Sequence, residues 1–529
     1  MPTKAKKIYG TASPLFERKL TRNAAGGKAY AYDNRHLLAQ VAATGMFGAQ
    51  PWGEDMVENL VQMATDLGDP EFVAKAALWA RKRGHIKDAP ALLCATLAHL
   101  APEAFRKVAP QVLDNGRMVR GLVGYLRRGG KAMPTCARKF VKDWFRARSA
   151  VRLLNDSVGS SGGEMSLADV IRLVHPKPKD VIQGAVLRYL LGKDMEGHEE
   201  LLPPFLKDLQ AFQRSPGSAP MPRVDFRLLT SMPLSTAQWT TIALQGGWQM
   251  VRMNLNTFAR HGVFGDAGVT RRVADKLRDP KAIAESRVLP FQLLTSHQYL
   301  SAEVPQEIRQ ALVEATEIAV SNIPPMTGKI YVCVDISGST HDPIRVSQGR
   351  SSTTCLDVAA LAASSIARLC PQAKIIPFHE SATTDFVARR TILETTQALK
   401  DLPDGGTDCS APLKTMKGED AENVAAIIYL SDNESWISSE GSYRGTETLH
   451  EWDRIRKSSP SAKLICIDIN PRGTTSQAPD KHGEILNIGG FSDAVFTGIR
   501  DFIETGRSWV QMIDSINLEK GLDFEDQED

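Results

Sequence analysis

A change in hydrophobic pattern at Ile323-Pro324-Pro325 constrains this chain more than any other feature, because two different kinds of fold must meet there. From about residue 34 to 320, apolar residues recur three and four positions apart in successive short segments, which predicts amphipathic helices. After residue 325, short apolar runs alternate with helical segments such as 356–369, which predicts βαβ units around a buried parallel sheet. The expected strands are 330–334, 374–378, 425–430 and 463–467.

The length of the chain requires more than one hydrophobic core. Domains usually stop growing at about 250–300 residues, so 529 residues predict two or three domains. In the first part, Asp69-Pro70 and Asp88-Ala-Pro90 have the form of helix starts, with a cap followed by a proline in the first turn. Short helices joined by short loops bury their apolar faces only against one another. This favours an α-solenoid or a bundle, although no clean repeat period is visible.

Three polar loops follow the expected strands and predict a metal site. Asp335-Ile-Ser337-Gly-Ser339 stands between the run 330–334 and a small-residue helical pattern, Thr407 lies in a glycine turn, and Asp432 follows the run 425–430. Ligands of doubly wound sheets bind at the carboxyl ends of the strands, so these side chains should meet there. Two carboxylates and three hydroxyls suit Mg²⁺, which prefers oxygen ligands and keeps some of its waters.

The same loops have three alternative explanations besides metal binding: helix capping, hydrolysis and acid–base catalysis. Ser337 and Ser339 could instead cap a helix, and for any one loop alone that is the simpler explanation. Hydrolysis has little support, because the loop lacks the second aspartate of a DxDxT motif and no GxSxG nucleophile elbow follows an expected strand. His379 and Glu434 could act as base and acid, although such residues are more often structural. We therefore expect a ligand-binding metal and no enzymatic activity.

The charge is distributed unevenly along the chain. The net charge is only +3, yet residues 106–152 contain thirteen Lys and Arg against Asp114 and Asp143, and the chain after Leu518 is acidic. A basic block attracts phosphate backbones, although an ordinary solvated helix face is the alternative.

The sequence also bears on the compartment. The seven cysteines form no CxxC pair, which predicts reduced thiols. The N-terminus has no apolar signal region, and no apolar run approaches the roughly 18–20 residues of a membrane span. We expect a soluble, cytoplasmic protein.

The three polar loops resemble the metal-ion-dependent adhesion site of a von Willebrand factor A (vWA) domain. A helical region ahead of such a domain resembles the Ro autoantigen family, whose bacterial members are called Ro-like or Rsr proteins. The resemblance covers nearly the whole chain. Its motifs are Asp335-Ile-Ser-Gly-Ser339, Gly405-Gly-Thr-Asp-Cys-Ser410, Ser431-Asp-Asn-Glu434, Asn23-Ala-Ala-Gly-Gly-Lys28, Met232-Pro-Leu-Ser235, Leu289-Pro-Phe-Gln292 and Ala168-Asp-Val-Ile-Arg-Leu-Val-His-Pro-Lys-Pro178.

The resemblance implies an α plus α/β architecture. A ring of HEAT-like helical repeats, the TROVE module, would be closed by a doubly wound vWA domain and would act as a monomer. The implied parts are an N-terminal basic arm at 1–22, the TROVE module at 23–325, the vWA domain at 326–515 and an acidic tail at 516–529.

The resemblance also implies a function in RNA quality control. Noncoding Y RNA would bind the outer basic surface, and single-stranded 3′ ends of misfolded RNA would enter the central hole. The Y RNA could tether the ring to polynucleotide phosphorylase. The ring itself would not be an enzyme. The alternative is a metal-dependent protein-interaction scaffold that has no role with RNA.

Residues expected to contact RNA follow from the basic block and from this resemblance. His175 is similar to the family histidine that contacts Y RNA, although the basic pair expected before it has no counterpart in 157–163. Trp144 and Phe145 are expected in the core. The candidate RNA contacts are Arg138, Lys139, Lys142, Arg146, Arg148, Arg152, Arg172, His175, Lys177 and Lys179.

Overall fold

The computed structural model describes residues 20–520 with short gaps. The gaps are 24–25, 46–53, 160–164, 196–198, 347–348, 433–434, 436–445, 472–474, 477, 480, 482 and 493. Glu434, most of the N-terminal arm and most of the acidic tail therefore lie outside the described residues. No described helix combines the length and the apolar character that crossing a membrane requires.

The chain forms two compact units. The first contains residues 1–67, 274–300 and 306–515, and the second contains 68–273, 301–305 and 516–529. The predicted limit at 515 coincides with a boundary between these units. The limits at 22 and 325 fall inside the first unit, because the vWA sheet gathers helices from both ends of the helical region. Those domain limits, like the closed ring, stay predictions.

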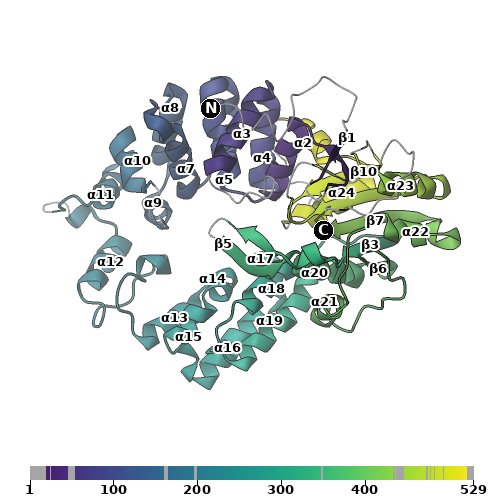
Figure 1. The fold of residues 1–529 in the computed structure, drawn as a ribbon. Helices are drawn as coiled ribbons and strands as arrows, with labels where there is room; N and C mark the ends of the chain where they lie inside the picture. Colours follow the sequence, from purple (N-terminus) through teal and green to yellow (C-terminus); the bar gives the residue numbers. More distant parts are fainter. Residues whose placement is uncertain are drawn as a thin grey trace. The chain divides into compact units, whose positions relative to one another are not determined.

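The second unit is helical, as the periodicity predicted (Figure 1). Neighbouring helices pack in pairs, α4 on α5 and α6, α5 on α7, and α6 on α8. Its helices are α4 (Pro70–Lys82), α5 (Asp88–Leu100), α6 (Pro102–Val112), α7 (Gly116–Arg127), α8 (Thr135–Ala147), α9 (Ala150–Asp156), α10 (Leu167–Val174), α11 (Val181–Leu190), α12 (Pro204–Arg214), α13 (Thr236–Gln245), α14 (Trp248–Met253), α15 (Leu255–Arg260) and the start of α16 (Ala267–Leu277).

One of the two predicted helix starts is confirmed in detail. The side chain of Asp69 accepts a hydrogen bond from the amide of Phe72 and caps α4, whose first residue is Pro70. Asp88 is instead the first residue of α5, and Lys87 precedes it without a side-chain cap.

The first unit contains a parallel sheet of five strands in the order β10-β8-β7-β3-β6. The strands are β3 (Lys329–Asp335), β6 (Ala373–Phe378), β7 (Val424–Ser431), β8 (Lys463–Asp468) and β10 (Ile485–Gly489). The four predicted strands are confirmed, and β10 is an addition to them. β3 lies between β6 and β7, so the chain reverses its direction of winding there. The carboxyl ends of β3 and β7 consequently form the crevice in which such folds bind ligands.

Helices cover both faces of this sheet. α20 (Cys355–Leu369) contacts β3, β6 and β7. Tyr331 and Cys333 of β3 belong to a core that also contains Leu413 of α22 (Ala411–Thr415) and Trp452 of α23 (Glu447–Ser458) (Figure 1). The remaining helices of this unit are α2 (Asn34–Thr44), α3 (Glu54–Asp66), α17 (Pro280–Ser286), α18 (Pro290–Gln298), α19 (Gln306–Ala319), α21 (Ile392–Lys400), α24 (Ala494–Thr505) and α25 (Trp509–Asp514).

Two small sheets lie outside the sequence predictions. The hairpin of β4 (Pro343–Val346) and β5 (Gly349–Thr354) separates Ser339 from α20. The strands β1 (Leu20–Arg22) and β2 (Lys28–Ala31) form an N-terminal hairpin, and β2 pairs with β9 (Thr475–Ser476).

The cysteines are unpaired, and most of them lie in the core. All seven are free thiols, and all except Cys136 are buried. Burial raises the pKa of the Cys94 and Cys333 thiols well above the usual range, which keeps these groups in the neutral form.

Candidate metal-binding site and basic surface

Asp335 begins the first loop of the predicted metal site. It is the last residue of β3 and is 0% exposed, and its Oδ1 accepts a hydrogen bond from the amide of Ser337 at 2.9 Å. The hydroxyls of Ser337 and Ser339 lie 3.3 Å apart. The hydroxyls of Ser337 and Ser339 therefore lie on the side of the loop that faces the Asp335 carboxylate.

The helix-capping explanation of these serines is wrong. A short 3₁₀ turn at Gly338–His341 follows Ser337, and the Ser337 side chain makes no capping hydrogen bond to it. The α-helix expected directly after Ser339 begins only at Cys355, and Thr354 caps it. Because helix capping does not use the serine hydroxyls, their position next to Asp335 calls for another explanation.

Asp432 supplies a second buried carboxylate. It follows β7 and is 1% exposed, while the preceding Ser431 donates its hydroxyl hydrogen to Asp335 Oδ2 at 2.6 Å. Burial, and then the negative charge of Asp432, raise the pKa of Asp335 to about 7. A cation between the two buried carboxylates would stabilise the charged form of Asp335.

The loop of Thr407 is attached directly to the first loop. The amide of Gly338 donates to the carbonyl of Gly405 at 3.1 Å, and the amide of Asp408 donates to the carbonyl of His379 at 3.0 Å. A Cβ at position 405 would lie 2.9 Å from His379 Nδ1, so only glycine permits this approach. Thr407 itself is 3% exposed.

Ser435 joins the Thr407 loop to the Asp432 loop. Its hydroxyl accepts a hydrogen bond from the amide of Cys409 at 3.2 Å and donates to the carbonyl of Thr407 at 3.3 Å. The structure thus brings the loops of Asp335, Thr407 and Asp432 together at the carboxyl edge of the sheet. Ser435 was missed by the sequence analysis, and only its position three residues after Asp432 could have indicated it.

The donor set fits a hard divalent cation. It offers two carboxylates and three hydroxyls, and of the five candidate ligands only Ser339 is partly exposed. A cation such as Mg²⁺ held here would supply positive charge that an acidic group from outside could reach on the side of Ser339.

The neighbouring charged residues have structural roles. The carboxylate of Asp408 accepts hydrogen bonds from the amide and hydroxyl of Ser410 and pairs with Lys414 at 3.1 Å. His379 Nδ1 accepts a hydrogen bond from the amide of Glu380 at 2.7 Å. These contacts use the carboxylate of Asp408 and one of the two ring nitrogens of His379.

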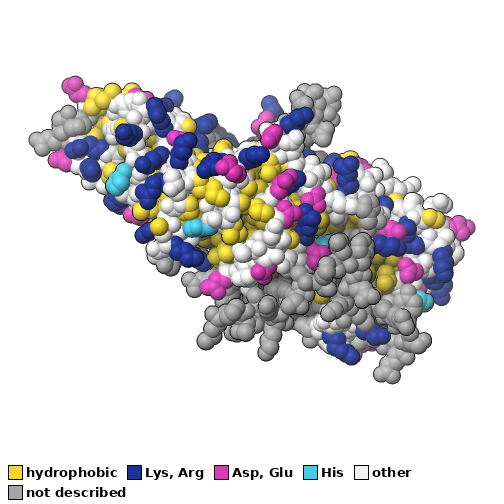
Figure 2. Space-filling view, turned by 90° about the horizontal axis from the view of Figure 1, so that it is seen from above, with side chains coloured by type: hydrophobic (Ala, Val, Ile, Leu, Met, Phe, Trp, Pro, Cys, Tyr) yellow, Lys and Arg dark blue, Asp and Glu magenta, His cyan; other side chains and the backbone are white. Residues whose placement is uncertain are grey.

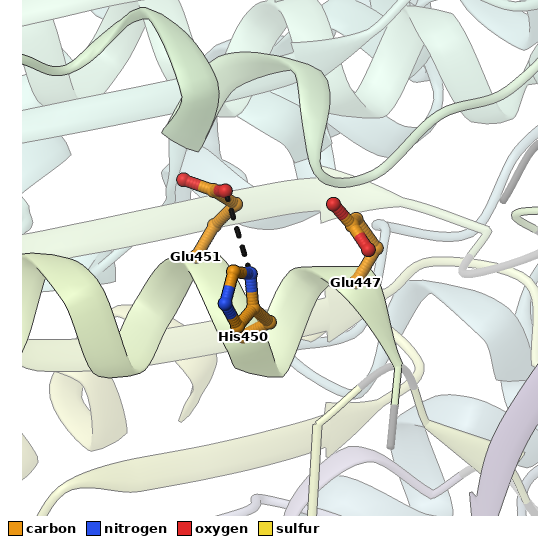
Figure 3. Close-up of side chains that lie close together, drawn as sticks. All are labelled: Glu447, His450 and Glu451. Atoms are coloured by element: carbon orange, nitrogen blue, oxygen red, sulfur yellow. Dashed lines mark ion pairs between the residues drawn. The ribbon is translucent and has the colours of Figure 1, made fainter. Parts of the chain in front are cut away.

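A second group of potential ligands lies on α23 (Figure 3). Ligand atoms of Glu447, His450 and Glu451 lie within 4.8 Å of one another, and His450 Nδ1 lies 3.6 Å from Glu451 Oε1. Glu451 also pairs with Arg454 at 2.8 Å, and Arg454 donates to the carbonyls of Leu413 and Met416. The group therefore includes an ion pair that fixes α23 to the end of α22. The Glu-x-x-His-Glu spacing on one helix was its signal in the sequence.

The helix α8 separates its basic residues into two sets. Lys139, Lys142 and Arg146 are exposed at spacings of three and four, so they share one face of the helix. Trp144 and Phe145 are 8% and 1% exposed, which confirms that these aromatics belong to the core.

Arg138 and Arg148 hold neighbouring segments in place. Arg138 donates to the carbonyl of Leu173 at 3.2 Å. Arg148 donates to the carbonyl of Asp114, lies 3.5 Å from the carboxylate of Asp156 and stacks 4.5 Å from the ring of Trp144. Their guanidinium groups are thus engaged inside the protein.

His175 occupies an exposed and unusual backbone position. It ends α10 in the left-handed conformation, with φ of 51°, and its amide donates to the carbonyl of Ile171. Arg172 pairs with Asp169 at 2.9 Å, while Lys177 and Lys179 are exposed on the segment that follows. Figure 2 shows Lys and Arg side chains gathered over the helical part of the face that it presents.

The fold defines a class: helical repeats joined to a vWA domain. Residues 329–503 match the family model described as the Ro60 vWA domain. The RNA-binding protein RO60 of Deinococcus radiodurans is 26% identical over 535 residues, which cover 91% of this chain and 94% of that protein.

A solved structure has the same fold. The crystal structure of the Deinococcus radiodurans RO (RSR) protein matches with a TM-score of 0.67 and 21% sequence identity, and the match covers 90% of this chain and 100% of that chain. These matches support the resemblance to the Ro family that the motifs indicated.

Proposed function

We propose that this protein binds RNA through the basic surface of its helical unit. The observation that carries the proposal is the state of six basic side chains. Among the described residues, none of these six takes part in an ion pair, and all are exposed: Lys139, Lys142, Arg146, Arg152, Lys177 and Lys179. Such groups are available for phosphates, whereas Arg138, Arg148 and Arg172 have partners within the protein. The relative from Deinococcus radiodurans, which is named an RNA-binding protein, supports the same function.

The finer proposal concerns the kind of RNA. Y RNA would bind the outer basic surface, with His175 among its contacts, and single-stranded 3′ ends of misfolded RNA would enter the hole of a ring. A Y RNA bound in this way could link the protein to polynucleotide phosphorylase in the cytoplasm. Affinity would come from phosphate contacts and would fall steeply with salt.

Filter binding tests this proposal directly. The probe is a structured RNA with a single-stranded 3′ tail, compared with the same RNA without the tail, at a low and a high salt concentration. We expect salt-sensitive binding that is tighter for the tailed RNA. Absence of salt-sensitive binding would refute the proposal. RNA that copurifies with the protein, once sequenced, identifies the partner.

We further propose that Asp335, Ser337, Ser339, Thr407 and Asp432 hold Mg²⁺ or a similar cation and that the site docks an acidic group without catalysis. The burial of the Asp335 and Asp432 carboxylates next to each other supports a cation site.

A calorimetric titration with Mn²⁺ tests the cation site: the wild-type protein should bind one ion, and Asp335→Ala should bind none. A metal-dependent interaction scaffold without an RNA role would bind Mn²⁺ yet fail the filter-binding test. Turnover of a phosphodiester that disappears in Asp335→Ala would contradict the proposed lack of catalysis.

A further inference from the structure

The residue Asn23 connects the N-terminal hairpin to the candidate metal site. It lies between β1 and β2 and is 7% exposed. Its Oδ1 accepts a hydrogen bond from the amide of Gly27 at 2.7 Å, and its Nδ2 donates to the carbonyl of Ser435 at 2.9 Å. One end of the amide thus closes the hairpin turn, and the other end binds a residue 412 positions away.

Ser435 links Asn23 to two loops of the proposed metal site. It stands three residues after Asp432, and its hydroxyl bridges the amide of Cys409 and the carbonyl of Thr407. The Asn23 amide holds the backbone of Ser435, while the Ser435 hydroxyl holds the Thr407 loop. The distance between the Thr407 and Asp432 loops therefore depends on the position of the turn that contains Asn23.

The hairpin that contains this turn is itself attached to other parts of the unit. β2 pairs with β9, Tyr30 opposite Ser476 and Ala31 opposite Thr475. The following helix α2 is anchored at β10, because Thr44 donates its hydroxyl hydrogen to the carbonyl of Gly489 at 2.7 Å. Gly26, which precedes Gly27 in the turn, has φ of 87°, a conformation that favours glycine.

We propose that Asn23 is a positioning residue of the metal site and that cation binding is linked to docking of the N-terminal hairpin. The inference rests on the proposed cation site. A cation that draws Thr407 and Asp432 together stabilises the contact of Ser435 with Asn23, and by linkage that contact increases the affinity for the cation. Loss of the contact would leave the ligating residues present but less well placed.

Two asparagine variants test the proposal in a Mn²⁺ titration of the full-length protein. Asn23→Asp keeps an acceptor for the Gly27 amide but has no hydrogen for the Ser435 carbonyl. Asn322→Asp is the matched control, because Asn322 Nδ2 donates to the carbonyls of Ile283 at 3.1 Å and Val288 at 2.8 Å in the same compact unit. Losing one such hydrogen bond should weaken Mn²⁺ binding about three- to tenfold in Asn23→Asp, and Asn322→Asp should bind Mn²⁺ like the wild type.

Hydrogen exchange supplies a readout that a general loss of stability would not change. Mn²⁺ should slow exchange of the Gly26 and Gly27 amides in the wild type and in Asn322→Asp, but not in Asn23→Asp. Ser435→Ala leaves the Asn23 bond to the backbone intact and removes the hydroxyl bridge, so it should weaken Mn²⁺ binding to a similar extent. It also serves if Asn23→Asp does not fold.

The outcomes separate this inference from the cation site on which it rests. If the wild-type protein binds Mn²⁺ and both Asn23→Asp and Ser435→Ala bind it equally well, the positioning role is wrong and the cation site stands. If the wild-type protein binds no Mn²⁺, both proposals are wrong.

Discussion

At the scale of single residues, the positions of the two buried carboxylates of the proposed metal site were predictable, but the groups that hold them were not. Asp335 and Asp432 follow apolar runs, and the carboxyl ends of neighbouring parallel strands must adjoin. Ser431 was visible only as part of a motif. Its hydroxyl reaches Asp335, 96 positions away, only because Asp335 and Ser431 end neighbouring strands. Such a contact depends on strand register, which hydrophobic runs alone do not specify.

The close approach of Gly405 to His379 gives a prediction for a single methyl group. Gly405→Ala places a Cβ 2.9 Å from His379 Nδ1, so either the ring of His379 or the loop, whose Gly405 carbonyl accepts from the Gly338 amide, must shift. We expect a loss of about 1–3 kcal/mol in unfolding free energy together with weaker Mn²⁺ binding, measured by chemical denaturation and calorimetry.

Removing the obstructing ring provides the control for this prediction. In the double variant Gly405→Ala/His379→Ala the space is free, so Mn²⁺ affinity should return toward that of His379→Ala alone. Gly265→Ala, where a Cβ would meet no atom within 4 Å, should change neither quantity. A double variant that binds Mn²⁺ as weakly as Gly405→Ala would rule out the steric explanation.

Asp156 gives a prediction about pH. Burial raises the pKa of Asp156 above its usual value, although the amide of Gly116 and the guanidinium of Arg148 act in the opposite direction. Because the folded-state pKa is the higher one, the stabilising contribution of Asp156 is complete below the unfolded-state value of about 3.8 and is lost as the pH rises through the folded-state value.

The variant Asp156→Asn tests this pH dependence. Its side chain cannot ionise, so its melting temperature should fall less between pH 4 and 7 than that of the wild type. Asp143→Asn, at an exposed position of α8, serves as the control. Parallel melting curves for wild type and Asp156→Asn across this range would contradict the prediction.

At the scale of elements, the strands and most helices followed from local patterns, and the errors arose where an element was inserted. The small-residue pattern after Ser339 suggested a helix at once, yet the β4–β5 hairpin comes first and α20 begins at Cys355. Thr354 and Asp357 form a capping box at that start, a local signal that could have located it. The hairpin had no comparable signal.

The two sides of α8 permit a prediction that separates stability from RNA binding. Arg138 bonds to the carbonyl of Leu173 on α10, whereas Lys139 is exposed. Arg138→Ala should lower the unfolding free energy by about 1–2 kcal/mol, and Lys139→Ala should change it by less than about 0.5 kcal/mol. In filter binding, Lys139→Ala should weaken RNA affinity and Arg138→Ala should not. The reverse assignment would show that the exposed face of α8 is not the RNA surface.

At the scale of the whole molecule, each compact unit is built from segments that are distant in the sequence. The N-terminal hairpin and α2 pack with the vWA sheet, and 516–520 pack with α6, where Lys107 pairs with Glu519 at 3.2 Å. A sequence divided at residues 22 and 325 does not indicate these contacts, because each joins segments some four hundred positions apart. The basic block was visible in the composition, but which of its members are available for RNA depends on partners such as Leu173 and Asp156 in other helices.

The central claim is that an exposed basic surface binds RNA phosphates, and the salt dependence of the affinity tests it most directly. Fluorescence anisotropy of the tailed RNA over a series of NaCl concentrations compares the wild type with Lys139→Ala/Lys142→Ala/Arg146→Ala. The control Lys281→Ala/Lys417→Ala/Lys457→Ala removes the same charge from exposed positions of the other compact unit. We predict that the logarithmic salt slope becomes shallower by about 2–3 in the first variant and does not change in the control. An equal slope in all three proteins would contradict the claim.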